Sequence, residues 1–236
     1  MTRQRDGAAL PGRSVVYVCP GLRCDIVPYV FYTEAPGGYL LDVRHVAVDS
    51  YAPSVGRDLL RFAAELPDVN EATVERVVVG GSAFSLGFTW NELLLATDEA
   101  SRHAGVPVIM DMSSVVAGLR NSGCERVAVA HRLAGVGDAA IAAFLESAGF
   151  DCAAVVSASQ DVATNAATPL REGAGAAADL AQRAMDAAPG ADAVLLLGGT
   201  WWSGEAERLV RATNRHFFNN VTAVAHDLPP LRPAPD

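Results

Sequence analysis

Short runs of apolar, mostly β-branched residues alternate along the chain with longer segments rich in alanine and leucine. The short runs are typical of buried strands, and the longer segments have the length of helices. This alternation predicts parallel sheets covered by helices on both faces, which places the chain in the α/β class. In the first half we expect strands at residues 15–19, 75–79 and 106–110, and helices at 55–65 (capped by Ser54), 90–104 and 113–122.

The second half of the chain repeats the same plan from residue 126 onward. We therefore expect two α/β lobes, the first formed by residues 1–118 plus 217–236 and the second by residues 119–216. The elements expected in the second half are strands at residues 126–130, 152–157, 193–197 and 221–225, and helices at 137–148, 173–188 and 205–214.

One strand in each half ends in two glycines followed by a hydroxyl residue, Gly80-Gly81-Ser82 in the first and Gly198-Gly199-Thr200 in the second. Ligands of open parallel sheets bind beyond the carboxyl ends of the strands. Glycine there lets the backbone approach a ligand, and free N–H groups form a nest for an anion. Two such nests would clamp one small anion between the halves. Each motif is also compatible with a simple tight turn between a strand and a helix.

Composition and charge narrow the classes of function. Half of the 236 residues are hydrophobic, which is typical of a chain with a substantial core. The formal net charge of −9, without a basic stripe, argues against nucleic acid as a partner. The apolar segments are too short to cross a bilayer and the N-terminus lacks an apolar signal segment. We therefore expect a cytoplasmic protein that has no membrane partner.

The sequence lacks the common cofactor and nucleophile motifs. It has no phosphate loop or dinucleotide fingerprint, no G-x-S-x-G elbow, and no cluster of ligands with metal-binding spacing. The four cysteines, which do not have disulfide-scaffold spacing and are expected to be free thiols, are Cys19, Cys24, Cys124 and Cys152. We therefore expect neither a metal nor an organic cofactor.

Several short segments follow one another in a familiar order. They are residues 80–85 (GGSAFS), 105–108 (GVPV), 113–119 (SSVVAGL), 126–130 (RVAVA), 142–145 (AAFL) and 188–199, while the first 60 residues contribute only 18–21 (VCPG). This series resembles the aspartate/glutamate racemase superfamily, and more closely its branch of arylmalonate decarboxylase and maleate cis-trans isomerase.

The resemblance implies two pseudo-symmetric, Rossmann-like lobes with parallel sheets and an active site in the interlobe cleft. Family members place a catalytic cysteine in one lobe or in both, and neighbouring backbone and hydroxyl donors hold a carboxylate as an oxyanion hole does. The cysteine positions correspond here to Gly80 and Gly198, so both cysteines are missing. The donors implied by the resemblance are Gly81, Ser82, Gly199 and Thr200.

Two residues are candidates to move a proton in place of the missing cysteines. His131 corresponds to a tyrosine that supports the carboxylate in the decarboxylase, and imidazole is the usual acid–base group near neutral pH. Cys19 ends the first strand, where a thiol between apolar walls is a proton donor or, beside a positive charge, a thiolate. Both also have a structural interpretation, His131 as a strand-end residue bonded to a loop and Cys19 as an inert buried thiol.

Aromatic residues follow both glycine turns and are candidates for apolar walls around a substrate. Trp201 follows the second turn and Phe84 follows the first. The alternative is that they belong to the core or to a subunit contact, where large aromatic side chains are also common.

These observations favour a cofactor-independent lyase that decarboxylates a small carboxylic or dicarboxylic acid, with or without an aryl or alkyl substituent, through an enolate-like intermediate. CO2 leaves without proton abstraction, so a lyase tolerates a missing base, whereas a racemase does not. Two alternatives stay open. One is a maleate isomerase-like isomerase or racemase that uses Cys19 and His131, and the other is a catalytically inactive homologue that binds a carboxylate. Assembly into a homo-oligomer also stays open.

Overall fold

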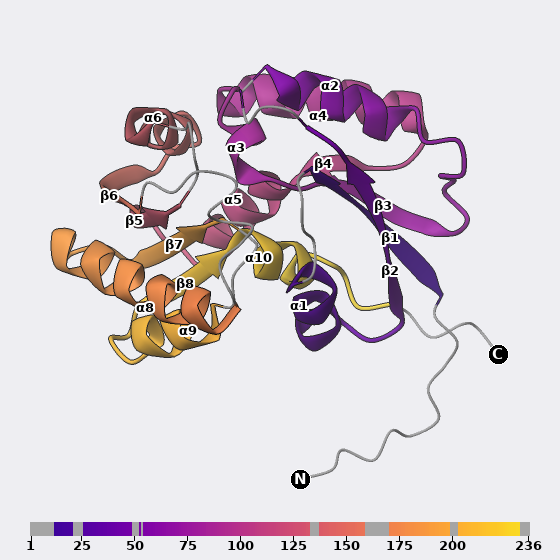
Figure 1. Ribbon diagram of the computed structural model, residues 1–236. Coiled ribbons are helices and arrows are strands. Elements are labelled where there is room, and N and C mark those ends of the chain that lie inside the picture. The colour runs from indigo at the N-terminus through magenta and orange to yellow at the C-terminus, as the bar shows by residue number, and fades with distance from the viewer. Residues whose placement is uncertain are drawn as a thin grey trace, which may run out of the picture.

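The computed structural model describes residues 12–20, 26–48, 52, 54–132, 137–158, 170–198 and 203–231. Within them the chain forms two four-stranded parallel sheets (Figure 1). The strand order is β2-β1-β3-β4 in the first sheet and β6-β5-β7-β8 in the second. The two lobes therefore share one topology, which confirms the predicted pseudo-symmetric α/β fold. The strands are β1 (Arg13–Pro20), β2 (Tyr39–Val46), β3 (Val74–Val79), β4 (Val108–Met110), β5 (Arg126–His131), β6 (Asp151–Ser157), β7 (Ala193–Leu197) and β8 (His216–Asn219).

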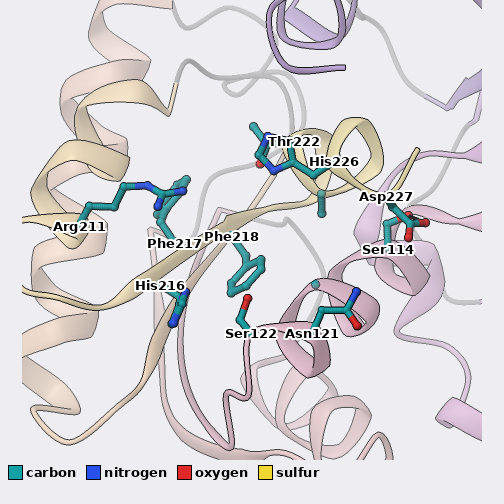
Figure 2. A pocket seen from close by; sticks show the side chains of 12 residues that line it. Ser114, Asn121, Ser122, Arg211, His216, Phe217, Phe218, Thr222, His226 and Asp227 are labelled. Atoms are coloured by element: carbon teal, nitrogen blue, oxygen red, sulfur yellow. Dashed lines mark hydrogen bonds between the residues drawn. The ribbon is translucent and has the colours of Figure 1, made fainter. Parts of the chain in front are cut away.

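Helices cover both faces of the sheets. Helices α2 and α4 lie together over one face of the first sheet, and α1 and α10 lie on its other side (Figure 1). Helix α5 connects the two sheets and packs beside α10 and β8, as Figure 2 shows from close by. The helices are α1 (Ile26–Glu34), α2 (Val55–Ala64), α3 (Ser82–Ser85), α4 (Trp90–Ala104), α5 (Asp111–Asn121), α6 (Asp138–Ser147), α8 (Leu170–Ala187), α9 (Gly204–Arg211) and α10 (Asn220–His226).

Strand β1 shows why its sequence is apolar at every position. Val16 and Val18 belong to a core cluster that includes residues of α2 and α4. Val15 and Tyr17 belong to a different cluster, together with residues of α1 and α10. Because successive side chains of a strand point to opposite faces, a strand buried on both faces needs apolar residues throughout.

One hydrophobic core runs through both lobes. Val127 and Leu195 of the second sheet lie in the same cluster as Val16 of the first sheet. The expected division after residue 118 falls inside α5, and β8 pairs with β7 in the second sheet. Helix α10, which follows β8 directly, packs against α5 and α1. The exact division into domains stays a prediction.

The end of the second lobe differs from the prediction. Residues 221–225 were expected to form a strand, but they lie in helix α10, and the strand is β8 just before it. The side chain of Asn219 caps the helix by accepting a hydrogen bond from the backbone N–H of Val221. Val221 and Val224 are both buried on one side of the helix, so the apolar run has helical spacing.

The segment between β1 and α2 also contains elements that the pattern did not predict. Helix α1 and the edge strand β2 both lie there. Strand β2 is only partly buried, which explains its mixed polar and apolar sequence. Ser54 precedes α2 as expected, but its side chain makes no capping hydrogen bond.

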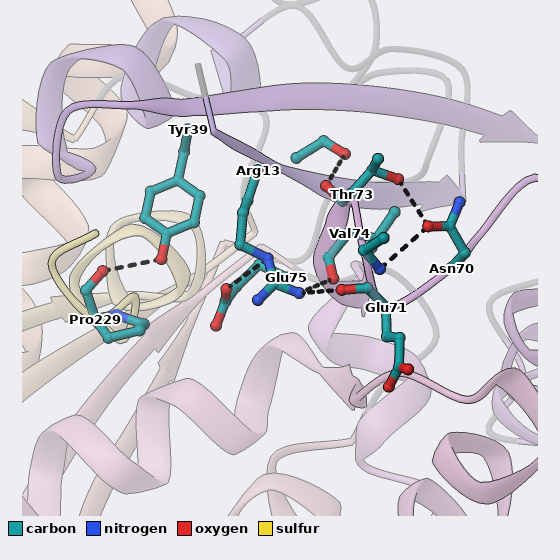
Figure 3. Close-up of polar contacts among 10 residues, drawn as sticks. Arg13, Tyr39, Asn70, Glu71, Thr73, Val74, Glu75 and Pro229 are labelled. Carbon is teal, nitrogen blue, oxygen red and sulfur yellow. Dashed lines mark hydrogen bonds and ion pairs between the residues drawn. The ribbon is translucent and has the colours of Figure 1, made fainter. Parts of the chain in front are cut away.

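The start and the end of the described chain meet at the first sheet, as Figure 3 shows. The hydroxyl of Tyr39 donates to the carbonyl of Pro229 at 2.9 Å. The guanidinium of Arg13 donates to the carbonyls of Glu71 and Val74, at 2.7 Å each. The Tyr39 contact attaches the segment after α10 to the first lobe, and the Arg13 contacts attach the start of β1 to the start of β3 and the residues before it.

A partly buried ion pair fixes the end of α10 to the first lobe. Asp227 accepts from Arg76 of β3 at 2.6 Å and from the hydroxyl of Ser114 of α5 at 3.0 Å. Replacing Asp227 by alanine leaves both donors without their charged acceptor. We expect the free energy of unfolding to fall by about 2 kcal/mol.

Urea denaturation measures this effect. The matched control is Asp98→Ala, which removes the exposed ion pair between Asp98 and Arg102 of α4. Exposed pairs contribute little, so the control should change the free energy of unfolding by less than about 0.5 kcal/mol. Equal effects of the two substitutions would contradict the role given to Asp227.

Candidate functional site

The first glycine turn closes tightly against β1. The amide of Gly80 donates to the carbonyl of Val18 at 2.9 Å, and Gly81 has a left-handed backbone with φ +88°. A Cβ on Gly81 would lie 2.8 Å from the ring of Phe84. A Cβ on Gly80 would lie 2.6 Å from Cε1 and Cζ of Tyr17. The ring of Tyr17 therefore fills the space beside the position that corresponds to the family's first-lobe cysteine.

This crowding gives a prediction for Gly80. Alanine at this position forces the Tyr17 ring out of its place in the core, and overpacking of this kind costs about 1–3 kcal/mol of unfolding free energy. The control is Gly175→Ala, because a Cβ there meets nothing within 4 Å and the residue lies inside α8. The control should stabilise the protein by about 0.5–1 kcal/mol. Thermal denaturation of both variants checks the opposite signs, and a stable Gly80→Ala protein would refute the crowding.

Next to this turn lies a buried carboxyl group that the sequence pattern did not single out. Asp111 is the first residue of α5 and is fully buried. Its Oδ2 accepts from Nδ2 of Asn220 at 2.7 Å and from Oγ of Ser82 at 3.4 Å. Burial raises the pKa of Asp111 to about 6, although hydrogen bonds from Asn220, the backbone N–H groups of Met112 and Gly81, and Ser82 act to lower it.

Asp111 and Asn220 come from equivalent places in the two lobes. Asp111 begins the helix after β4, and Asn220 begins the helix after β8, the fourth strand of each sheet. Their hydrogen bond therefore joins the lobes at the seam between α5 and α10. The sequence feature that could have pointed to Asp111 and Asn220 is a polar residue soon after each of these apolar strands.

The second lobe brings His131 and Gly198 to its own carboxyl edge. His131 ends β5 and is paired in register with Leu197, the last residue of β7. Gly198 follows with a φ of +111°. The side chain of His131 is only 1% exposed, and its Nε2 lies 3.0 Å from Oδ1 of Asp138 in α6. A carboxylate in this position orients the imidazole ring.

A buried cation follows His131 directly. The side chain of Arg132 is 3% exposed, and burial lowers its pKa to about 10. Because this value is well above 7, the guanidinium remains charged at neutral pH. The sequence pattern did not predict a cation at this edge. A positive charge there favours the approach of an anion.

The structure places most of the expected residues at the carboxyl ends of central strands. Cys19 lies one residue before the end of β1 and is buried in the cluster that contains Tyr17. Phe84 is fully buried in the main core, where it supports the Gly81 turn. Strands β1 and β3 are neighbours, as are β5 and β7, and each pair marks the point where the strand order reverses. Such switch points are the usual ligand sites of α/β sheets.

Some predicted residues lie outside the described part of the chain. They are Gly199, Thr200, Trp201 and Cys24. Cys124 and Cys152 are described, and burial raises the pKa of each thiol to about 11, as suits structural cysteines. Within the described ranges, no group of three or more His, Cys, Asp or Glu side chains is placed to hold a metal ion. No helix in the same ranges is long and apolar enough to span a membrane.

A cavity of about 330 Å³ lies elsewhere, at the second half of α5 and the start of β8 (Figure 2). Asn121 at the end of α5, Ser122 directly after it, Phe218 of β8 and Thr222 of α10 are among its lining residues. Its lining residues include neither the glycines of the two turns nor His131 or Cys19. It is thus separate from the edge that carries the glycine turns.

Comparison with known proteins agrees with the fold. Residues 34–223 match the model of the arylmalonate decarboxylase family. Unliganded arylmalonate decarboxylase superposes with a TM-score of 0.70 at 20% identity, covering 89% of this chain and 88% of that one. Maleate isomerase Iso from Pseudomonas putida S16 superposes with a TM-score of 0.71 at 15% identity, covering 90% of each chain. Maleate cis-trans isomerase from Nocardia farcinica bound to TRIS gives a TM-score of 0.69 at 16% identity, covering 90% and 89%. No curated protein matches the chain.

Proposed function

The chain belongs to the arylmalonate decarboxylase family, and we propose that it is a cofactor-independent decarboxylase of small, aryl- or alkyl-substituted dicarboxylic acids. Membership in a family of this chemistry supports an enzyme that acts as a decarboxylase or an isomerase. The finer assignment, to substrate class and mechanism, rests on the chain's own residues.

The observation that carries the proposal is the pair of glycine turns. Gly81, the second glycine of the first turn, and Gly198, the first glycine of the second turn, both have a positive φ. The turns follow β3 and β7, which occupy the same place in their sheets. One carboxylate of the substrate binds between the turns, with Gly199 and Thr200 completing the second one. Backbone N–H groups fixed in this way stabilise negative charge that develops during a reaction.

The proposed reaction breaks one carbon–carbon bond of the substrate and forms one carbon–hydrogen bond. The bond between the α carbon and the second carboxyl group breaks, CO2 leaves, and the electron pair remains as an enediolate on the carboxylate that is held. His131 supplies a proton to the α carbon and recovers it from water. Asp138, 3.0 Å from Nε2, orients the imidazole. Arg132 adds a positive charge on the same side, and Trp201 supplies an apolar contact for the substituent. Phe84 was expected to do the same, but it is fully buried in the core and supports the first glycine turn instead.

The loss of both family cysteines favours decarboxylation. A racemase needs a base on each face of the substrate, whereas CO2 departure needs none. Tyr17 also crowds the space beside Gly80, so a nucleophile at that position is not accommodated. One acid, placed on one side, is sufficient for a decarboxylase.

An isomerase or racemase is the second candidate, and one observation favours it. Cys19 and His131 lie at the carboxyl ends of β1 and β5, which are equivalent strands of the two sheets. A thiol and an imidazole from opposite lobes would give the two acid–base groups that such a reaction requires. A carboxylate-binding homologue without activity is the third candidate.

Three measurements separate these functions. We expect CO2 release from substituted malonates, followed by manometry or a coupled bicarbonate assay. Exchange of the α hydrogen in D2O without CO2 release, or conversion of maleate to fumarate, would instead identify an isomerase or racemase. Binding of phenylacetate without any reaction would identify an inactive homologue. Location in the cytoplasm and assembly into a homo-oligomer stay predictions.

A further inference from the structure

The two carboxyl oxygens of Asp111 have different surroundings. Oδ2 accepts hydrogen bonds from Asn220 and Ser82. Oδ1 is buried, and no described residue meets it in full hydrogen-bond geometry, although the backbone N–H groups of Met112 and Gly81 act on the carboxyl group. An oxygen that accepts two hydrogen bonds behaves as the carbonyl oxygen of the acid, so a proton on this group resides on Oδ1. The protonated Oδ1 is then a buried hydrogen-bond donor without an acceptor. Such a group costs free energy unless a ligand supplies the acceptor.

The neighbours of Asp111 are polar but uncharged. No charged side chain is among the causes of its pKa shift. The neighbours that act on this pKa are Gly81 of the first turn, Ser82 of α3, Met112 of α5 and Asn220 of α10. The charged groups carried by α5 and α10, including the residue after α10, are Arg120, His226 and Asp227, and they lie at the opposite ends of these helices. A buried carboxyl group that has no positive charge beside it favours its neutral, protonated form.

The place of Asp111 brings this donor to the proposed site. It follows β4 at the same edge of the sheet as the Gly81 turn, and the N–H of Gly81 is close enough to act on its carboxyl group. Asn220 reaches it from the other lobe. An anion held at the first turn therefore lies beside Asp111, at the seam of the two lobes.

Resting on the proposed function, we propose that Asp111 binds the substrate as a neutral carboxylic acid and donates its Oδ1 proton to an oxygen of the substrate carboxylate. A carboxyl group kept neutral by an apolar site is a strong donor to a developing oxyanion. Ser82 and Asn220 act as positioning residues, because they hold Oδ2 and so turn Oδ1 toward the ligand. Ser82 thereby acts on the substrate through Asp111.

Proton uptake on ligand binding tests this role directly. Because the pKa of Asp111 is about 6, most of the free protein carries the ionised form at pH 8, and binding of a carboxylate must then take up close to one proton. Isothermal titration with phenylacetate in two buffers of different ionisation enthalpy measures this number. We expect close to one proton at pH 8, about half a proton at pH 6, where the ligand is fully ionised, and affinity that falls about tenfold per pH unit above 6.

The variant Asp111→Asn is the matched control. Its amide oxygen accepts from Ser82 and Asn220, and its amide N–H takes the place of the Oδ1 proton without titrating. We expect proton uptake at pH 8 to be smaller by close to one proton than in the wild type, kcat/KM at pH 6 to stay within about tenfold of the wild type, and its decline at alkaline pH to disappear. Asp111→Ala, which has no donor, should lower kcat/KM by about 10²-fold or more.

Two results would overturn the role of Asp111 alone: unchanged proton uptake in Asp111→Asn, or a loss of activity as large as that of Asp111→Ala while the asparagine variant still folds. In both cases the wild type would still release CO2, so the proposed function would stand. If the wild type neither binds phenylacetate nor releases CO2, the proposed function fails and the role of Asp111 fails with it.

Discussion

Replacing His131 by glutamine should lower kcat for decarboxylation by about 10²- to 10⁴-fold, the usual contribution of a general acid. Glutamine is close in size to histidine and donates hydrogen bonds, but it cannot deliver a proton. The side chain of His131 is almost fully buried at the end of β5, so a variant of similar volume is needed to keep the fold. Steady-state kinetics at pH 6–8, with circular dichroism to verify folding, measures the effect.

Two further variants show whether the loss belongs to His131 itself. Asp138→Asn removes the carboxylate that lies 3.0 Å from Nε2, and it should cause a smaller loss because the imidazole remains. Cys19→Ala should leave more activity than the His131 variant does. If Cys19→Ala abolishes turnover and His131→Gln does not, the proton comes from the first lobe and the assignment is wrong.

The second large effect concerns stability. Replacing Asp111 by asparagine should change the free energy of unfolding more favourably at pH 8 than at pH 4, by about 2–3 kcal/mol. Burial raises the pKa of this carboxyl group from 3.8 to about 6 in the folded chain. The folded state therefore holds the proton more tightly than the unfolded state. The stability that the neutral group confers is present below pH 4 and is lost as the pH rises through 6.

Asparagine does not titrate, so the variant does not lose stability through this group as the pH rises. Urea denaturation of both proteins at pH 4, 5, 6, 7 and 8 measures the difference in their free energies of unfolding. The contributions of other ionisable groups cancel in this difference because the two chains share them. The difference between the free energies of unfolding should grow between pH 4 and 6 and then level off. Parallel curves at every pH would show that Asp111 titrates normally in the folded protein.

The alternation of apolar runs was sufficient to predict the architecture because these strands are buried on both faces. Strand β7 and helix α4 begin and end where the pattern places them. Helix α4 has clear local signals, with a capping box formed by Thr89 and Glu92 and a left-handed Gly105 at its end. Strand β2 was missed because it is half exposed at a sheet edge and mixes polar with apolar residues.

The site could be predicted only in part from the sequence. Glycine pairs are visible because the need for a left-handed backbone limits which residues can stand there, and Gly81 and Gly198 both have it. Asp111 and Asn220 carry no local motif. Their meaning depends on a contact between residues 109 positions apart, and on burial that removes water from a carboxyl group. Neither property can be read from spacing along the chain.

The central claim is that two glycine turns, one from each lobe, hold a single carboxylate between them. A crystal structure of the protein with bound phenylacetate tests it most directly. We predict that the carboxylate lies at the seam of the lobes, with its oxygens about 3 Å from backbone N–H groups of the Gly81 turn and of the turn that begins at Gly198. A ligand held by only one lobe, or seated instead in the cavity between α5 and α10 in Figure 2, would contradict the account.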